Sequence, residues 1–337
     1  MKFELSIVSG KTVFDLVRAH RAECIRVVRE TYLAHAEGQS LNPDSYFLTF
    51  PDKPGCRIIA LPAYLGKSFG VAGIKWIASF PGNIQRGFPR ASAVVVLNSY
   101  ETGYPFAILE GSVLSAARTA ASAVLAADWL TDKARHIRSL GIVGTGFIAR
   151  YVYEFFVETD WQIDEVELYD VVPAEADKFR GRTCRPEKHR RVQLAQDIGQ
   201  LMKACDVILL TTVASKPHIH NFGLFQHNPV VLHLSLRDLD PEIILRSQNV
   251  VDDVEHVMKA NTSSHLAEQK AGNRDFVTGT LAEIITGRAS LHRNRPIIFS
   301  PFGMGILDIA VGKWIYDQAV AAGLDKRFDD FFYDVTR

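Results

Sequence analysis

The sequence predicts an α/β protein in which a doubly wound parallel sheet is joined to a second, discontinuous α+β domain. With 337 residues, the chain is longer than the roughly 250 to 300 residues at which a single hydrophobic core stops growing, so two domains are expected. From residue 139 onward, apolar strand-like runs alternate with helical stretches, which is typical of a parallel sheet. A glycine-rich turn follows the first of these runs. This combination indicates a Rossmann domain.

Composition and patterning narrow the classes of function. Lys plus Arg and Asp plus Glu both number 38, so no excess charge points to nucleic acid or a membrane surface as a partner. The longest apolar runs are shorter than the roughly 18 residues of a membrane span, and the four cysteines are scattered, which fits a reducing cytoplasm. The histidines form no H-x-x-x-H pattern, and His218 with His220 is interpreted as loop. We expect a soluble, cytoplasmic protein without a metal.

The first part of the chain predicts one long helix and an antiparallel sheet. Residues 12–37 have the apolar spacing of an amphipathic helix, with Thr12 as its cap. Pro and Gly separate the strand-like runs that follow, which are 57–61, 71–80, 93–97 and 106–109. An alanine-rich helix over residues 112–130 has small side chains that permit close packing, and we expect it to bridge two domains.

The second part predicts the parallel sheet and a return to the first domain. Its expected strands are 139–143, 166–169, 192–195, 207–211, 230–234 and 250–251. A last helix over about 305–322 comes too late in the chain to continue this sheet. The predicted domains are therefore 1–118 with 305–337, and 119–304.

The strongest local motif is G-x-G-x-x-A at residues 144–149, between an apolar strand and a helix. Gly144 permits the tight turn, Gly146 lets the backbone approach a pyrophosphate, and the helix start offers N–H groups to the anion. Asp170, at the end of the next strand, would accept hydrogen bonds from the ribose of NAD and repel the phosphate of NADP. The alternatives are a plain tight turn with Asp170 as a helix cap, and an NADP site reached by the basic segment 178–191. No Arg directly follows Asp170, so NAD is the predicted cofactor.

Three charged residues are candidates for chemistry. Lys75 lies among small and apolar residues of its strand face, where a cation needs an anionic partner or a cleft; alternatively it is an ordinary lysine on the wet face of an edge strand. Arg118 interrupts the alanine-rich helix and could grip a carboxylate or form a salt bridge. Asp238 follows the strand 230–234 and could act as a base or cap a helix, and Asp240 is an equally good cap.

Four motifs in this order resemble the ornithine cyclodeaminase and mu-crystallin family over nearly the whole chain. They are Gly73-Ile74-Lys75-Trp76, Ala117-Arg118-Thr119-Ala120-Ala121, Gly144-Thr145-Gly146 and Pro301-Phe302-Gly303-Met304-Gly305-Ile306-Leu307-Asp308-Ile309. Within the family, the segments 57–63, 75–81 and 90–93 look most like the N-(2-amino-2-carboxyethyl)-L-glutamate dehydrogenases, which make 2,3-diaminopropionate for siderophores.

The resemblance implies roles for residues and an assembly. The first domain, completed by the C-terminal helix, would bind substrate and pair the subunits of a homodimer. Lys75 and Arg118 would hold the carboxylate of an amino-acid substrate, with Lys75 also in the catalytic centre, while Asp238 would handle protons and water. The motif and the resemblance together give these cofactor-binding residues: Thr119, Gly144, Thr145, Gly146, Phe147, Ile148, Asp170, Thr211, Ser235, Gly303 and Met304.

The implied reaction is the NAD-dependent oxidation of N-(2-amino-2-carboxyethyl)-L-glutamate and its hydrolysis to 2-oxoglutarate and 2,3-diaminopropionate. This chain departs from the subgroup at Thr49, where relatives of this subgroup usually have Arg. A cation expected at the substrate carboxylate is therefore missing. Arg57, which is nearby in sequence, is the residue that could replace it. The alternatives are an ornithine cyclodeaminase-like lyase, an imine reductase or amino-acid dehydrogenase, and a mu-crystallin-like binding protein.

Overall fold

The computed structural model describes residues 4–66 and 68–333. Its contacts divide the chain into two compact units, Met1–Arg118 with Met304–Arg337, and Thr119–Gly303. The first unit is therefore built from both ends of the chain, and the second is continuous in sequence.

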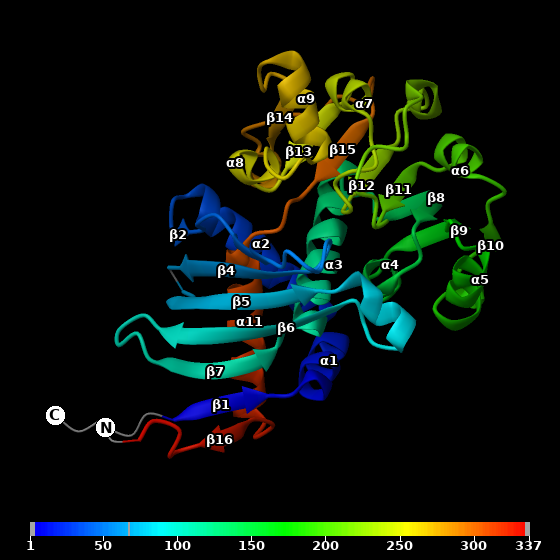
Figure 1. Ribbon diagram of the computed structural model, residues 1–337. Coiled ribbons are helices and arrows are strands. Elements are labelled where there is room, and N and C mark those ends of the chain that lie inside the picture. The colour runs from blue at the N-terminus through cyan, green and yellow to red at the C-terminus, as the bar shows by residue number, and fades with distance from the viewer. Residues whose placement is uncertain (1–3, 67, 334–337) are drawn as a thin grey trace. The chain divides into compact units, whose positions relative to one another are not determined.

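The first unit contains an eight-stranded mixed sheet (Figure 1). Its order is β16-β1-β7-β6-β5-β4-β2, and β3 pairs with β4. The strands are β1 (Leu5–Val8), β2 (Ser40–Leu41), β3 (Tyr46–Thr49), β4 (Arg57–Leu65), β5 (Val71–Ser79), β6 (Ala91–Ser99), β7 (Pro105–Glu110) and β16 (Lys326–Phe328). The predicted antiparallel run is confirmed as β4 to β7, but β1 pairs in parallel with β7. The four shorter strands give too few residues for a period-2 pattern, and the sequence did not predict them.

The single helix predicted over residues 12–37 is wrong. The segment forms α1 (Gly10–Ala19) and α2 (Arg21–Ala36), separated at His20, whose φ of −132° and ψ of 42° are not helical. The cap of α1 is Ser9, which accepts a hydrogen bond from the backbone N–H of Thr12. A break of one residue leaves the spacing of apolar residues almost unchanged, so periodicity does not reveal it.

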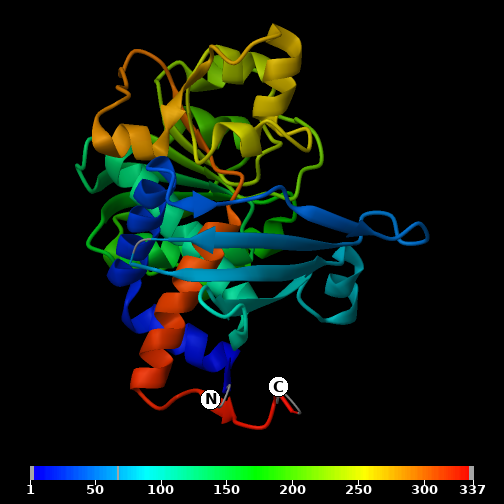
Figure 2. The same cartoon turned by 90° about the vertical axis from the view of Figure 1, so that its left-hand side faces the viewer.

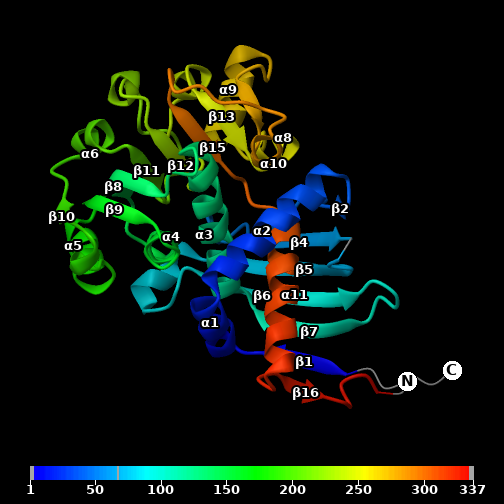
Figure 3. The same cartoon turned by 180° about the vertical axis from the view of Figure 1, so that it is seen from behind.

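Helices α1, α2 and α11 (Gly305–Ala321) lie on one side of this sheet (Figures 2 and 3). Helix α11 packs on β4, β5 and β6. The fit is close: a Cβ on Gly73 would lie 2.3 Å from the carbonyl oxygen of Val96 and 3.2 Å from Ile309 of α11. The unit is completed by η1 (Pro81–Arg86) and by the start of α3 (Gly111–Leu130), which runs on into the second unit.

The second unit contains an all-parallel sheet of eight strands in the order β10-β9-β8-β11-β12-β15-β13-β14 (Figure 1). The strands are β8 (His136–Val143), β9 (Gln162–Tyr169), β10 (Arg191–Leu194), β11 (Val207–Leu210), β12 (Val230–His233), β13 (Gln248–Val251), β14 (Val277–Thr280) and β15 (Ile297–Ser300). The predicted Rossmann sheet is confirmed, with β14 and β15 as additional strands. Its helices are α4 (Phe147–Val157), α5 (Pro173–Arg182), α6 (Ile198–Ala204), α7 (Pro241–Leu245), α8 (Val254–Val257), α9 (Ser263–Ala271) and α10 (Leu281–Thr286), with η2 (Pro186–Lys188) and η3 (Phe222–Phe225).

The chain order of the strands reverses between β8 and β11. In open α/β sheets, ligands bind at the carboxyl ends of the strands beside such a switch point. The glycine-rich turn follows β8 and Thr211 follows β11, so both lie at this edge.

No helix of the described residues is long and apolar enough to cross a membrane.

Candidate functional site

The turn after β8 requires glycine at position 144. Gly144 has a φ of +83°, and a Cβ there would lie 2.9 Å from the carbonyl oxygen of Thr211. The Thr211 hydroxyl donates to the Gly144 carbonyl at 2.7 Å, which ties the turn to the end of β11. Gly146 is different, because a Cβ there would meet no protein atom within 4 Å. It precedes α4 without a side-chain cap, so the first N–H groups of the helix face a surface that can hold an anion such as a phosphate.

Asp170 has a second role that the sequence did not predict. Its Oδ2 accepts hydrogen bonds from the backbone N–H of Thr145 at 2.8 Å and from the Thr145 hydroxyl at 2.9 Å. Its Oδ1 accepts from the backbone N–H of Val172 at 3.0 Å. A carboxylate offers about four lone-pair sites, so this residue can hold the turn and still accept a further hydrogen bond.

The remaining residues that were predicted to bind the cofactor lie in three places: at the start of α4, in α3, and in the turn before α11. Phe147 is 47% exposed, Ile148 and Thr119 are half-buried, and Met304 is fully buried. Gly303 has a φ of +92°.

The Gly303 turn is fixed by Asp252, a residue that the sequence did not predict. The buried Asp252 carboxylate accepts the backbone N–H groups of Phe302 at 2.9 Å and Gly303 at 2.6 Å. Burial raises the pKa of Asp252 above its ordinary value, although these N–H groups favour the charged form.

In the first unit, Lys75 and Arg118 converge on one carboxylate. Lys75 Nζ donates to Asp308 Oδ2 at 2.6 Å, and Arg118 Nε donates to Asp308 Oδ1 at 3.1 Å. Both cations also reach the Ser115 hydroxyl, at 3.2 and 3.4 Å. The side chain of Asp308 is fully buried, and those of Lys75 and Arg118 are 3% and 12% exposed. Within the part of the chain that the structure describes, two cations therefore share one anion, and the group keeps one positive charge in excess.

Burial and these charges shift the ionisation of the group. Burial lowers the pKa of Lys75 to about 8, although Asp308 favours the charged form. Burial alone would raise the pKa of Asp308, but Arg118 and Lys75 hold it below its ordinary value. The alternative of a solvated lysine on an edge strand is excluded, because β5 lies between β4 and β6 and Lys75 is buried.

Asp308 was not among the predicted site residues. It is an acid between apolar neighbours in the sequence of α11, Ile306, Leu307 and Ile309, and this isolated charge was the available signal.

Arg57 lies directly opposite Thr49 in the antiparallel pair of β3 and β4. Directly opposite residues have their side chains on the same face of a sheet, so Arg57 reaches the side on which Thr49 lies. The pairing of Leu61 with Lys75 puts Arg57, four residues earlier on β4, on the face of Lys75 as well. At about 3.3 Å per residue, the two cations are spaced by roughly 13 Å along the sheet.

Asp238 lies at the centre of a polar network beyond β12. Its Oδ1 accepts from His218 Nε2 at 3.0 Å and from the Thr212 hydroxyl. Its Oδ2 accepts from the Ser235 hydroxyl and lies 3.2 Å from His233 Nε2, which also lies 3.2 Å from the backbone nitrogen of Asp238. Burial would raise the pKa of Asp238, but the hydrogen bonds and the charge of His233 hold it well below the ordinary value. Asp238 is therefore a buried anion.

The structure also gives Asp238 and Asp240 different roles. Asp240 is the N-cap of α7, where its carboxylate accepts the backbone N–H of Glu242 at 3.0 Å. Helix capping therefore belongs to Asp240. The partners of Asp238, namely Thr212, His218 and His233, were not predicted, because they come from different strand ends that only the folded sheet brings together.

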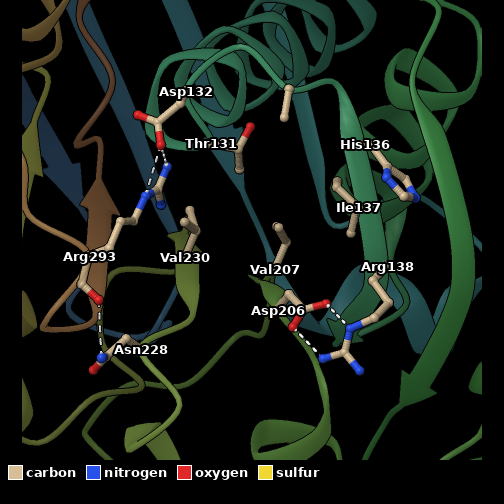
Figure 4. A pocket seen from close by; sticks show the side chains of 11 residues that line it. Thr131, Asp132, His136, Ile137, Arg138, Asp206, Val207, Asn228, Val230 and Arg293 are labelled. Atoms are coloured by element: carbon tan, nitrogen blue, oxygen red, sulfur yellow. Dashed lines mark hydrogen bonds and ion pairs between the residues drawn. The ribbon is translucent and has the colours of Figure 1, made fainter.

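A hollow of about 480 Å³ in the second unit is lined by none of the predicted site residues (Figure 4). The first residues of three strands line it: His136 of β8, Val207 of β11 and Val230 of β12. Two ion pairs flank it in Figure 4, Arg293 with Asp132 and Arg138 with Asp206. The hollow lies at the amino edge of the sheet, opposite to the glycine-rich turn. Sheets of this kind bind ligands at the carboxyl edge.

Within residues 4–66 and 68–333, no three His, Cys, Asp or Glu side chains are grouped so that they could hold a metal ion.

Known proteins are similar to this chain over nearly their whole length. The N-((2S)-2-amino-2-carboxyethyl)-L-glutamate dehydrogenase of Staphylococcus aureus is 28% identical over 308 residues, 89% of this chain and 91% of that protein. The alanine dehydrogenase of Archaeoglobus fulgidus is 30% identical over 322 residues, 92% of this chain and 94% of that protein. A solved archaeal alanine dehydrogenase dimer with bound NAD is 28% identical, with a TM-score of 0.84 over 98% of this chain and 100% of that one.

The sequence profile of the ornithine cyclodeaminase/mu-crystallin family matches residues 11–323. That match spans both units, including the glycine-rich turn and the group of Lys75, Arg118 and Asp308. The chain belongs to the ornithine cyclodeaminase/mu-crystallin family.

Proposed function

We propose that this protein is an NAD-dependent oxidoreductase that acts on the CH–NH bond of a carboxylated amine. The observation that carries this proposal is the buried group of Lys75, Arg118 and Asp308, which has one positive charge in excess. A buried cation needs an anionic partner, and the carboxylate of an amino-acid substrate is one. The relatives with amino-acid dehydrogenase names support this substrate class.

The glycine-rich turn fits NAD. Gly146 leaves open space beside uncapped N–H groups at the start of α4, which suits a pyrophosphate. Asp170 lies at the end of β9, where an acid accepts the ribose hydroxyls and disfavours a 2′-phosphate. When bound, NAD supplies the acceptor for a hydride.

Lys75 and Arg118 would orient the substrate. Lys75 has three N–H donors and uses two on Asp308 and Ser115, so a third can bind a carboxylate oxygen. Arg118 offers a planar fork that can bind the other oxygen. Two fixed donors hold the reacting Cα in one orientation, which is how a binding site contributes to rate.

The finer proposal is that the substrate is N-(2-amino-2-carboxyethyl)-L-glutamate, which carries three carboxylates. Arg57 lies directly opposite Thr49, on the same face of the sheet as Lys75 and roughly 13 Å away along the strands, where it would bind a second carboxylate. Oxidation at the glutamyl Cα and hydrolysis of the imine would give 2-oxoglutarate and 2,3-diaminopropionate, a precursor for siderophore or related biosynthesis. A substrate as short as alanine has no group for Arg57.

The test is NADH formation by the purified protein with NAD and three substrates in parallel: N-(2-amino-2-carboxyethyl)-L-glutamate, L-alanine and L-ornithine. We expect one NADH and one 2-oxoglutarate per molecule of the first substrate. Faster NADH formation from L-alanine would assign the activity to an amino-acid dehydrogenase, and proline without net NADH would assign it to a cyclodeaminase. NAD binding without turnover on any of the three would contradict the proposed activity.

We also propose that the protein is a cytoplasmic homodimer joined through the first unit. One row of directly paired residues, Tyr46, Ala60, Trp76 and Val94, lies on the sheet face opposite to that of Lys75 and α11. Tyr46 is 72% exposed, and Trp76 and Val94 are 42% and 40% exposed, which is typical of a surface that a partner covers. The solved relative described as a dimer supports this. Light scattering that gives the mass of one chain would contradict it.

Replacing Asp170 should change cofactor preference. We expect Asp170→Ala to reduce the ratio of NAD to NADP affinity by about tenfold or more, because one hydrogen bond to a charged group contributes about 1.5 to 3 kcal/mol. Loss of the hydrogen bonds to Thr145 would weaken both cofactors equally, so the ratio isolates the effect of charge. The control is Asp177→Ala, an exposed acid of α5 paired with Arg180. An unchanged ratio, measured as the two Kd values by fluorescence, would remove Asp170 from cofactor selection.

The pKa of Lys75 predicts opposite pH trends for binding and stability. As pH rises through about 8, Lys75 loses its proton and KM for the carboxylated amine should increase, while Kd for NAD should not. The unfolded chain holds this proton up to an ordinary pKa of 10.5, so between about 8 and 10.5 it binds more protons than the folded protein. The contribution of Lys75 to the free energy of unfolding therefore rises with pH across that window. A KM that is flat through pH 8 would argue against Lys75 as a carboxylate ligand.

A further inference from the structure

Two histidine–aspartate pairs lie next to each other in the second unit, and they differ in burial. His218 pairs with Asp238 at 3.0 Å, and His220 pairs with Asp240 at 2.9 Å. A single backbone bridge, between Ile219 and Leu239, lies between the two pairs. The Asp238 side chain is fully buried, whereas that of Asp240 is 27% exposed. The two pairs are therefore chemically different although both join the loop after β11 to the segment after β12.

Asp238 has little capacity left for a substrate proton. Its two oxygens accept from His218, Ser235 and Thr212, and His233 Nε2 lies 3.2 Å from Oδ2 and 3.2 Å from the backbone nitrogen of Asp238. A carboxylate has about four lone-pair sites, and these contacts occupy most of them. Protonating Asp238 would displace one of these buried donors and leave it unpaired, which is costly. The anion can stabilise a neighbouring positive charge, but it is poorly placed to receive a proton itself.

His218 connects this buried anion to the surface. Its side chain is 40% exposed, while His233, the other histidine on Asp238, is fully buried. The backbone N–H of His218 donates to the carbonyl oxygen of Asp238 at 3.0 Å, so backbone and side chain are both fixed to the same residue. Since Nε2 donates its proton to the carboxylate, Nδ1 is the nitrogen with a free lone pair. Among the described residues, Nδ1 of His218 has no hydrogen-bond partner.

The network is adjacent to the proposed cofactor turn. Thr211 donates to the carbonyl oxygen of Gly144, and the next residue, Thr212, donates to Asp238. One strand end therefore links the glycine-rich turn to the pair of His218 and Asp238. This places a proton acceptor at the carboxyl edge of the sheet, beside the switch point.

We propose that His218 is the catalytic residue that accepts and returns the proton in the reaction, and that Asp238 is a positioning residue that holds the ring and stabilises its positive charge. This inference rests on the proposed function. The Cα–H bond of the free amine breaks, its electron pair leaves as hydride to NAD, and the nitrogen lone pair forms the C=N bond. Water then adds to the iminium carbon and gives its proton to Nδ1 of His218. The imidazolium returns that proton to nitrogen as the C–N bond breaks, and the new carbonyl group releases the hydroxyl proton to solvent. Aspartate and histidine act in the same way in other hydrolytic sites.

The test compares His218→Ala with His220→Ala, a matched change two residues along the same loop. We expect His218→Ala to slow NADH formation by about 100-fold or more while Kd for NAD stays unchanged, and added imidazole to restore part of the rate. His220→Ala should keep the wild-type rate, and imidazole should not change it. In the NAD-free wild type, nitrogen-resolved NMR of the His218 ring should show its proton on Nε2.

The outcomes are distinguishable. Equal rates in the two variants would overturn the role of His218 while leaving the proposed function intact. A slow His218→Ala that imidazole does not restore, with a weaker Kd for NAD, would show that the residue is structural. A wild type that forms no NADH from any tested amine would overturn the proposed function, and this inference with it.

Discussion

Asp308→Asn should lower the free energy of unfolding by about 3 to 5 kcal/mol, because among the described residues it removes the only negative partner of two buried cations. Lys75 and Arg118 both donate to this carboxylate, and neither side chain is more than 12% exposed. Asparagine has nearly the same shape, so the loss would reflect charge and not volume. The measurement is denaturant unfolding followed by circular dichroism.

The matched control is Asp317→Asn, the same change in the same helix. Asp317 pairs with Lys313 at the surface, where its side chain is 50% exposed, so the expected loss is below about 1 kcal/mol. Combining Asp308→Asn with Lys75→Met should recover part of the stability, since one unpaired cation is removed. If Asp308→Asn were as mild as Asp317→Asn, the two cations would not depend on Asp308.

Asp238→Asn should lower kcat by roughly 1,000- to 10,000-fold and leave Kd for NAD within the wild-type range. An asparagine at this position cannot stabilise an imidazolium and would present N–H groups to donors such as Ser235 and His218. The substitution disturbs the whole network, so its effect should exceed that of removing one ring. The measurements are NADH formation and, separately, NAD binding by fluorescence.

Asp240→Asn is the control for that experiment. Asp240 caps α7 and pairs with the exposed His220, so we expect turnover close to wild type and a stability loss of about 1 kcal/mol or less. Should Asp240→Asn abolish turnover and Asp238→Asn preserve it, the positioning role would have to be reassigned to Asp240 and its partner His220. An unchanged kcat in both variants would exclude either carboxylate from the mechanism.

The Rossmann unit could be predicted because its signals are local. Each buried parallel strand is a short apolar run of sequence. The turn directly after β8 requires glycine at position 144, so the strand and its turn form one continuous motif. The antiparallel run β4 to β7 could be predicted for the same reason, from alternation bounded by Gly and Pro.

The candidate site could be predicted only in part because its contacts are distant in sequence. Lys75 and Asp308 are separated by 233 residues, and no local pattern joins them. The apolar surroundings of Lys75 indicated that it needed a partner, but the identity of that partner emerged only when α11 was placed on β5. Likewise, Asp238 could be located at the edge of the sheet, whereas the histidines that surround it could not.

The return of α11 to the first unit has a consequence for synthesis on the ribosome. All strands of this unit except β16 emerge first, but the helix that packs on β4, β5 and β6 and supplies Asp308 is translated only after all of Thr119–Gly303. At about 5 to 20 residues per second, the central strands β4, β5 and β6 wait roughly 10 to 40 s for α11, and during that time Lys75 lacks its counter-ion. The continuous second unit meets no such delay and can fold during that interval. Nascent chains of this protein should therefore depend on chaperones mainly through the segment that is made first.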